Sequence, residues 1–501
     1  MNFLASSIAT IVAVGIGFVA TPFLLRWLGE DRLGLFKVSL EWLGYLTLLE
    51  LGTGAALAPL ILQARANIDG ERETAILAAG LRRYVTVAVL TLLVGAGLVA
   101  ALPWVTRTPP ELRSELWIGA GLYLLIMSLV FPLALYRALA EATQKTYLVS
   151  SLLTAQGIVM AVLAVAMAYA GWGLIGQFLA TAVGSIVVAF GLAFVMRRLA
   201  PFARLVHPNV DLTEATSRVR SLSRLTLLQS FIGRVCLMTD NIVISLFLGP
   251  AAVTAFFLTQ SLTRMATTVL QSVGGSTWAG LCELYQTGQH DLFRQRLLQL
   301  TNFTAILGAV FVLPVAVLTK PFVHLWVGSS QYAGDAVAAI AVTNALLLPV
   351  FSLWGWVYNG TGRVDRLMSY FIKLAILNSS FSIIATWMLG LAGPLIGTLV
   401  VHLTYTPWKM SKLLREDFAI PRFSLLVHGL APFPLCLISL LGLAFLRESW
   451  PNYTWYRLGL EYTGAALGNM AIVWCFALSK RERAFLADML TRRLKTTRFP
   501  E

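Results

Sequence analysis

Long apolar runs separated by short polar turns dominate the chain. A helix that crosses a bilayer needs about 20 predominantly apolar residues, and about fourteen such runs are present, with glycines such as Gly390 at the tightest links. The pattern predicts an all-α integral membrane protein with about fourteen transmembrane helices. The predicted spans are residues 3–25, 38–62, 84–104, 116–136, 147–169, 174–196, 225–248, 253–280, 298–319, 336–359, 368–388, 391–408, 424–446 and 458–479.

The composition supports a bilayer as the solvent. Of the 501 residues, 57% are hydrophobic and only 12% charged, whereas soluble domains carry about 25% charged residues. The net charge of +14 does not indicate a nucleic-acid partner, because most of the chain could not face water. The four cysteines, Cys236, Cys282, Cys436 and Cys475, lack the paired spacing of a zinc site or a redox motif.

Lys and Arg concentrate in alternate turns, which predicts that both chain ends are cytoplasmic. We therefore expect a multi-pass protein of a bacterial inner (cytoplasmic) membrane. Residues 201–223 and 481–501 are basic and amphipathic, and are expected to lie on membrane lipid.

An internal repeat of about 220 residues organises the spans. Leu28-Gly29 recurs as Leu248-Gly249, and Leu174-Ile175-Gly176 recurs as Leu395-Ile396-Gly397. Because six spans return the chain to its starting side, the repeats are parallel. We expect two six-helix lobes plus two extra carboxy-terminal helices. The predicted parts are an N-lobe (1–200), a linker helix (201–223), a C-lobe (224–415), the extra helices (416–480) and the basic tail (481–501).

Three cations within spans suggest a binding cavity, because charges in a bilayer are costly and usually functional. Arginine suits a pyrophosphate through two-pronged hydrogen bonding, and neighbouring polar and aromatic side chains suit sugars. Pairing of an arginine with Asp240, and plain packing of the aromatic residues, are the alternatives. The candidate substrate-binding residues are Arg234, Arg264, Lys373, Gln260, Gln271, Asn241, Asn378 and Tyr370.

The acidic residues within spans are candidates for coupling transport to Na⁺ or H⁺. We favour Asp240 and Glu50 over Glu41, which Lys37 one turn away can neutralise. Salt bridges are the alternative use of all these carboxylates. No cofactor is expected, and no histidine has partners at metal-ligand spacing.

The sequence resembles the polysaccharide-transporter branch of the multidrug, oligosaccharidyl-lipid and polysaccharide (MOP) exporter superfamily, which includes Wzx-type flippases. The carriers of this resemblance are Leu28, Gly29, Gly34 and Phe36, then Leu49-Glu50-Leu51-Gly52, and then Asp240, Ile242, Val243, Ile244, Leu248-Gly249 and Phe256. The family pattern has Asp where Glu50 stands. The resemblance implies two six-helix lobes that move lipid-linked sugars by alternating access.

The sequence leaves three functions open. The first is a flippase for undecaprenyl-pyrophosphate-linked oligosaccharide, with polysaccharide polymerase and chain-length proteins as candidate partners. The second is a cation-coupled multidrug exporter of the same superfamily. The third is a membrane glycosyltransferase or polymerase, which the short loops and the lack of a catalytic constellation disfavour, so that a transporter rather than an enzyme is expected.

Overall fold

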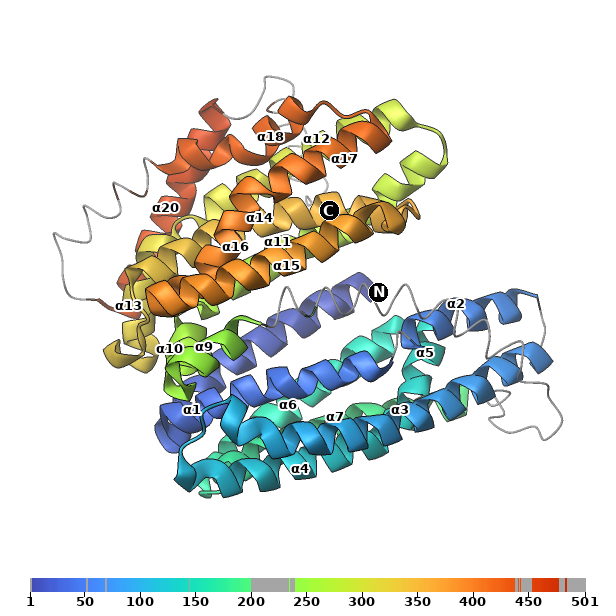
Figure 1. Ribbon diagram of the computed structural model, residues 1–501. Helices are drawn as coiled ribbons and strands as arrows, with labels where there is room; N and C mark the ends of the chain where they lie inside the picture. The colour runs from blue at the N-terminus through green and yellow to red at the C-terminus, as the bar shows by residue number, and fades with distance from the viewer. Residues whose placement is uncertain are drawn as a thin grey trace, which may run out of the picture. The chain divides into compact units, whose positions relative to one another are not determined.

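The computed structural model describes residues 2–50, 53–67, 70–143, 145–199, 234, 239–437, 440, 442, 453–476 and 483. Within these ranges all regular structure is helical and strands are absent (Figure 1). The predicted all-α membrane fold is confirmed. The expected linker helix (201–223) and, apart from Arg483, the expected basic tail (481–501) lie outside the described residues.

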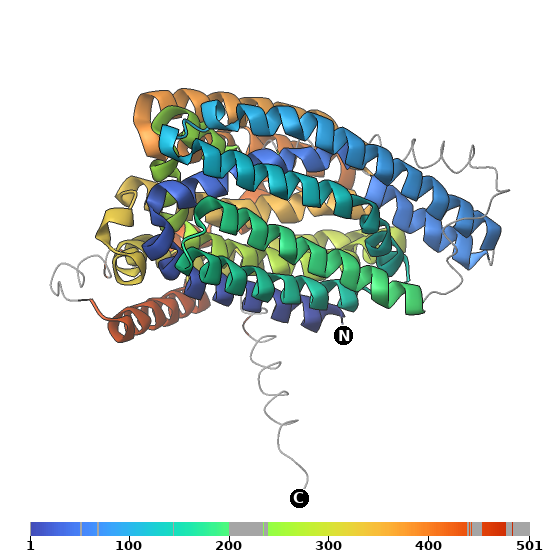
Figure 2. The same ribbon diagram turned by 90° about the horizontal axis from the view of Figure 1, so that it is seen from below.

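Contacts divide the chain into two compact units. The first unit is Met1–Leu258 with Phe371–Gly397, and the second is Thr259–Tyr370 with Thr398–Glu501. In each unit the long helices run side by side (Figure 1 and Figure 2). The first unit contains α1 (Asn2–Gly44), η1 (Tyr45–Glu50), α2 (Thr53–Ala66), α3 (Gly70–Val105), η2 (Pro110–Leu112), α4 (Arg113–Val130), η3 (Phe131–Ala134), α5 (Leu135–Ala142), α6 (Thr146–Tyr169), α7 (Gly173–Leu199), α9 (Asp240–Leu248), most of α10 (Pro250–Thr259) and η6 (Gly390–Ala392).

The second unit contains α11 (Ser261–Gln286), α12 (His290–Leu307), η4 (Gly308–Val312), α13 (Val315–Val327), η5 (Ser329–Gln331), α14 (Asp335–Gly360), α17 (Thr406–Phe418), α18 (Arg422–Leu430) and α20 (Trp455–Phe476). Two helices, α15 (Val364–Leu389) and α16 (Gly393–Thr404), contribute to both units.

Each predicted span coincides, in its described part, with one or more of these helices. Six helical segments of the described chain are long and apolar enough by themselves to cross a membrane, and a seventh is gained if α12 with η4 is joined to α13 across a 42° bend. One of the six, Val364–Phe418, covers two predicted spans. The fold is that of a multi-pass membrane protein.

The outward faces of these helices are apolar, as lipid contact requires. Leu93 on α3 and Leu129 on α4 are exposed, although the same side chains would be unfavourable in water. Because lipid tails are as apolar as leucine, association between the helices depends on close packing and interhelical hydrogen bonds. Gly95 shows this on α3, since a Cβ there would overlap a Leu124 methyl carbon of α4.

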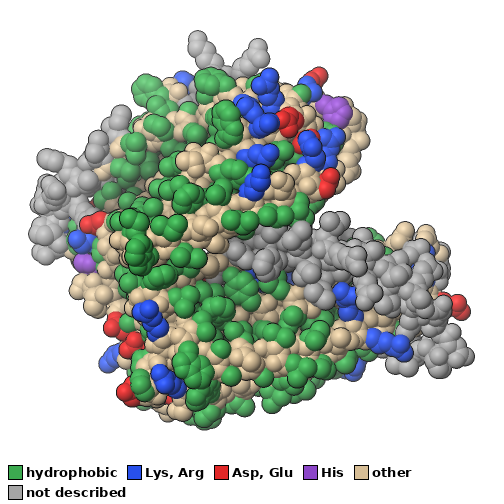
Figure 3. All heavy atoms as spheres, in the orientation of Figure 1, with side chains coloured by type: hydrophobic (Ala, Val, Ile, Leu, Met, Phe, Trp, Pro, Cys, Tyr) green, Lys and Arg blue, Asp and Glu red, His purple; other side chains and the backbone are tan. Residues whose placement is uncertain are grey.

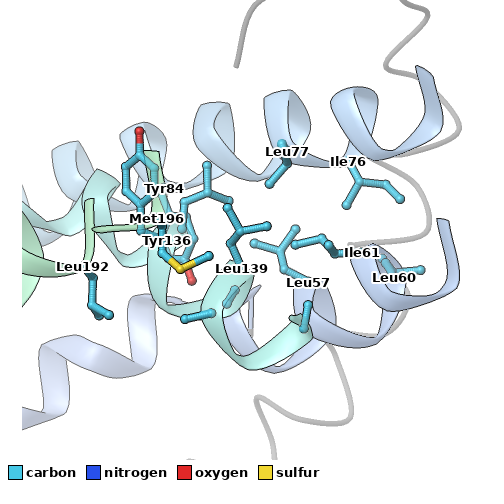
Figure 4. Packing of buried hydrophobic residues seen from close by; sticks show 14 of the residues in the cluster. Leu57, Leu60, Ile61, Ile76, Leu77, Tyr84, Tyr136, Leu139, Leu192 and Met196 are labelled. Atoms are coloured by element: carbon cyan, nitrogen blue, oxygen red, sulfur yellow. The ribbon is translucent and has the colours of Figure 1, made fainter. Parts of the chain in front are cut away.

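One core of the first unit joins α2, α3, α5 and α7. Leu57 and Ile61 lie one turn apart on α2, so that both face this core, and Tyr84 of α3 and Met196 of α7 close it (Figure 4). The core fixes α2, which begins three residues after Glu50, relative to α3. Its labelled members are Leu57, Leu60, Ile61, Ile76, Leu77, Tyr84, Tyr136, Leu139, Leu192 and Met196.

A helix break in the second unit is held by α20. A π-helical turn closes with the bond from the Leu313 N–H to the Gly308 carbonyl, 3.1 Å long. If the same π-helical pattern continued by one residue, the N–H of residue 314 would donate to the Ala309 carbonyl. That residue is Pro314, which has no N–H. Asn469 of α20, which is 0% exposed, donates its Nδ2–H to that carbonyl at 2.9 Å instead. The extra carboxy-terminal helix therefore completes the backbone hydrogen bonding of the break.

The internal repeat is visible in the backbone. Gly29 has φ 80° and ψ 171° at a kink in α1, and Gly249 has φ 89° and ψ 174° between α9 and α10. Only glycine adopts this conformation without strain. Two positions that the sequence made equivalent thus have the same rare geometry, which supports the predicted repeat.

The two repeat-equivalent segments also pack on each other within the first unit. A Cβ on Gly34 would overlap the Pro250 carbonyl oxygen. The Thr254 hydroxyl donates to the Glu30 carbonyl at 2.7 Å. Residues 30 and 34 are the repeat counterparts of 250 and 254, so the two contacts join equivalent positions of the repeat.

Turns assigned by sequence to the same membrane side contact one another. On one side, the Arg32 guanidinium donates to both Glu115 carboxylate oxygens at 3.0 and 2.7 Å, and the Leu174 N–H donates to the same carboxylate at 3.0 Å. In the turns predicted for the other side, Asp417 accepts from Arg366 at 3.1 Å, and Arg294 donates to the Phe418 carbonyl at 2.9 Å. These contacts agree with the predicted alternation of the turns.

Candidate substrate and coupling site

A polar cluster forms in the first unit where the second half of α1 meets α9. Asn241, which is 5% exposed, donates its Nδ2–H to Glu41 Oε1 at 2.5 Å. The contact joins residues from two helices that are far apart in sequence. Since the donor is an amide and the acceptor a carboxylate, the bond is charge-assisted and stronger than a neutral one. Lys37, one turn before Glu41, has its ammonium 4.3 Å from the centre of the Phe257 ring.

Arg234 reaches the same stretch of α1. A Cβ on Gly44 would lie 2.9 Å from the Arg234 Nη1 atom, so the missing side chain leaves space for the guanidinium. Beside it, the hydroxyls of Tyr45 and Thr239 are 3.3 Å apart. A cation, an amide and hydroxyl groups therefore converge on the end of α1 and the start of η1, between Glu41 and Tyr45. We call residues Glu41, Tyr45, Arg234, Thr239 and Asn241 the α1 polar cluster.

Sequence reasoning found part of this cluster. It singled out Arg234 and Asn241, which the structure brings to neighbouring turns of α1. It ranked Glu41 below Asp240 and Glu50, and it omitted Tyr45 and Thr239. The available signal for Glu41 was a carboxylate inside a predicted span.

Glu50 has a well-defined set of contacts away from the α1 polar cluster. Its Oε1 accepts hydrogen bonds from the Gly54 N–H at 3.0 Å and from the Tyr84 hydroxyl at 2.9 Å. The first bond caps the amino terminus of α2, where helical N–H groups lack partners. Arg83 donates to the Thr53 hydroxyl one turn away, at 2.8 Å. The Glu50 carboxylate thus links η1, α2 and α3, and its role in ion coupling stays a prediction.

The remaining candidates of the first unit lie on α9 and α15. Asp240 is the first residue of α9, where the helix dipole favours a negative charge, and α9 packs against η6. Asn378 of α15 is buried, whereas Lys373 is exposed.

The second unit holds the other four predicted substrate-binding residues. Arg264 is exposed on α11, and Gln260 is buried just before this helix. Gln271 is half-buried two turns beyond Arg264. Tyr370 is 4% exposed, with its ring stacked on Tyr405 at 5.7 Å between centroids and its hydroxyl bonded to Thr406 at 3.3 Å. The predicted residues are thus divided between the two units.

The described residues contain no group of three or more His, Cys, Asp or Glu side chains that could hold a metal ion. The α1 polar cluster offers a guanidinium that can bind an anion, at Arg234, and a carboxylate that can bind a proton or a monovalent cation, at Glu41.

A known protein family matches the first part of the chain. Residues 1–279 match a family model described as polysaccharide biosynthesis protein. The chain belongs to this polysaccharide biosynthesis family. The match covers more than half of the chain and includes every residue of the α1 polar cluster. No curated protein matches the sequence.

Solved structures show which fold this member of the polysaccharide biosynthesis family has. An inward closed conformation of the lipid II flippase MurJ matches with a TM-score of 0.72 and 14% identity, covering 94% of this chain and 99% of that chain. An inward-facing multidrug resistance MATE transporter of the MOP superfamily matches with a TM-score of 0.62 and 16% identity, covering 82% and 96%. A MATE transporter from Vibrio cholerae matches with a TM-score of 0.56 and 15% identity, covering 83% and 96%.

These likenesses confirm the predicted fold, which this family member adopts over nearly its whole length. At such low identity they indicate the fold alone.

Proposed function

We propose that the protein is a flippase that moves undecaprenyl-pyrophosphate-linked oligosaccharide across a bacterial inner membrane by alternating access. The observation that carries the proposal is the combination, in one chain, of a polysaccharide biosynthesis family match and the fold of a lipid II flippase. The family match supports a role in polysaccharide biosynthesis, and the fold supports the mode of action of a flippase. The proposed direction is from the cytoplasmic leaflet to the periplasmic leaflet.

Arg234 is the proposed contact for the pyrophosphate. Its guanidinium is the one described cation in the α1 polar cluster. Its planar fork can donate two parallel hydrogen bonds to neighbouring phosphate oxygens, which an ammonium cannot do. Arg264 and Lys373 are proposed as further cationic contacts. Gln260, Gln271, Asn378 and Tyr370 are proposed to bind the sugar.

Glu41 joins Asp240 and Glu50 as a proposed coupling residue. Its carboxylate lies in a predicted span, bonds to a buried amide and belongs to the residue one turn before Gly44, which Arg234 approaches. Protonation or Na⁺ binding at Glu41 would change the charge on the stretch of α1 that Arg234 approaches, which is how an ion could alter the hold on an anionic lipid. Polysaccharide polymerase and chain-length proteins are proposed partners.

The experiment is a flipping assay with purified full-length protein in liposomes that contain lipid-linked oligosaccharide. Arg234→Ala is expected to reduce the rate at least tenfold, since hydrogen bonds to charged groups contribute about 1.5–3 kcal/mol. Arg234→Lys should retain part of the rate. Arg296→Ala is the matched control, because this cation of α12 bonds only to Gln299 among the described residues and should flip normally.

A deletion strain tests the same proposal in cells. Lipid-linked oligosaccharide should accumulate on the cytoplasmic leaflet, and unaltered export of every surface polysaccharide would reject the proposal. Efflux of cationic dyes without sugar-lipid flipping would instead support a multidrug exporter, and sugar transfer by the purified protein would indicate a glycosyltransferase.

A further inference from the structure

A pocket of about 560 Å³ lies at the turn between α17 and α18 in the second unit. The turn is tight because Ala419 adopts a left-handed conformation, with φ 56°, at the end of α17, and Pro421 precedes the first residue of α18. This geometry brings Arg415, from the last turn of α17, next to Arg422, at the start of α18. The lining residues are Arg415, Ala419, Pro421, Arg422 and Phe423.

The charges of the two arginines are not offset by acidic residues in the described part of the chain. Neither Arg415 nor Arg422 forms an ion pair there, and the buried Arg422 Nε has no hydrogen-bond acceptor among those residues. The two acidic residues of α17 are engaged by another cation: Arg366 lies 3.8 Å from Glu416 and 3.1 Å from Asp417. The pocket therefore presents two guanidinium groups and is complementary to an anion.

Aromatic side chains flank the cationic pocket. Trp408 is 66% exposed and Phe423 is 79% exposed, although both are large and apolar. The Arg422 guanidinium lies 5.0 Å from the centre of the Trp408 ring. Exposed tryptophan is typical of the boundary between lipid and water, and α17 lies between two predicted spans. Figure 3 shows Lys and Arg side chains gathered over the end of the second unit where α17 lies in Figure 1.

We propose that this pocket binds the phosphate headgroup of an anionic membrane lipid. The two guanidinium groups would hold the phosphate oxygens, while Trp408 and Phe423 would contact the apolar part of the same molecule. The apolar flank favours a lipid over a soluble phosphate ion. The occupant is a resident lipid and not the transported substrate, so this site does not depend on the proposed cargo.

The test measures lipid binding to the purified full-length protein in detergent by native mass spectrometry. The probes are phosphatidylglycerol, which is anionic, and phosphatidylcholine, which is neutral overall. Each basic residue near a membrane surface contributes about 1 kcal/mol, so replacing both Arg415→Gln and Arg422→Gln should weaken phosphatidylglycerol binding about 30-fold. Lys412→Gln removes a charge from the same helix outside the pocket, and this control should change binding less than about threefold.

Further variants and probes distinguish a specific binding site from general electrostatic attraction between the lipid and the protein. Arg422→Lys keeps the charge but loses the guanidinium fork, so it should weaken binding several-fold even if the double variant does not fold. An equal loss in Lys412→Gln, or unchanged binding in the double and Arg422→Lys variants, would overturn the proposal. Displacement of phosphatidylglycerol by inorganic phosphate at equal concentration would identify a soluble anion as the ligand and also reject it.

Discussion

Replacing Asn469 with leucine tests whether α20 stabilises the break between η4 and α13. The substitution keeps the side chain's approximate volume but removes the donor to the Ala309 carbonyl, which Pro314 cannot supply. A buried acceptor left without a donor costs about 1–3 kcal/mol, whereas interhelical hydrogen bonds measured in a membrane average about 0.6 kcal/mol and reach about 1.7. We therefore expect Asn469→Leu to lower the free energy of unfolding by about 1–2 kcal/mol.

The measurement is a titration of the purified variants with dodecyl sulfate in mixed micelles, followed by circular dichroism. A second substitution, Pro314→Ala, restores a backbone N–H five residues beyond Ala309, where the π-helical pattern needs it. In the Pro314→Ala background, Asn469→Leu should lower the free energy of unfolding by roughly 1 kcal/mol less than it does with Pro314 present. This difference is the coupling energy of the double-mutant cycle. Tyr462→Phe serves as a comparison, because its exposed hydroxyl donates to the nearby Phe311 carbonyl and its removal should cost less.

Two results would refute this reasoning. If Asn469→Leu lowers stability equally with Pro314 and with alanine at that position, the amide does not replace the missing N–H. If it has no effect in either background, the bond contributes nothing to the stability of the break.

Three further predictions address packing, transport and topology. Gly34→Ala should destabilise the protein by about 1–3 kcal/mol, because the added Cβ would overlap backbone at the crossing of α1 and α10. The control is Gly17→Ala, in the same helix, which should not destabilise the protein because nothing lies within 4 Å of its Cβ. Equal melting temperatures of the two variants would contradict this prediction. Arg264→Ala should impair complementation of a deletion strain at normal abundance, so full complementation would remove Arg264 from the proposed site. In a cysteine-free background, an impermeant maleimide should label Asp31→Cys in intact cells and Lys412→Cys only after permeabilisation, and the reverse labelling would invert the predicted topology.

The sequence predicted the spans well because the bilayer imposes a direct requirement on the length of an apolar run. Each predicted span has a helix in its described part. The repeat could also be predicted from the sequence, since Gly29 and Gly249 stand at equivalent positions that both adopt a backbone conformation favourable only for glycine. The break after η4 was not, because a π-helical turn and the donor from Asn469 follow from packing between distant helices.

The candidate site was only partly predictable for a similar reason. Arg234 and Asn241 stood out as polar residues within a predicted span. Glu41 was judged by its local neighbour Lys37, but its bond to Asn241 joins residues 200 positions apart. The capping of α2 by Glu50 has a local component at Gly54, whereas the bond from Tyr84 depends on how α3 packs. Contacts between helices distant in sequence therefore limited the prediction more than residue chemistry did.

The crossing of α1 and α10 has a consequence for how such a chain can arise. If two identical halves met at this crossing, the residue at 34 and its counterpart at 254 would be the same. With glycine at both positions, residue 254 would lose its hydroxyl bond to the Glu30 carbonyl. With threonine at both positions, residue 34 would place a side chain where α1 and the Pro250 carbonyl touch. The observed pair requires halves that differ in sequence, and a duplicated gene joined into a single chain allows that divergence.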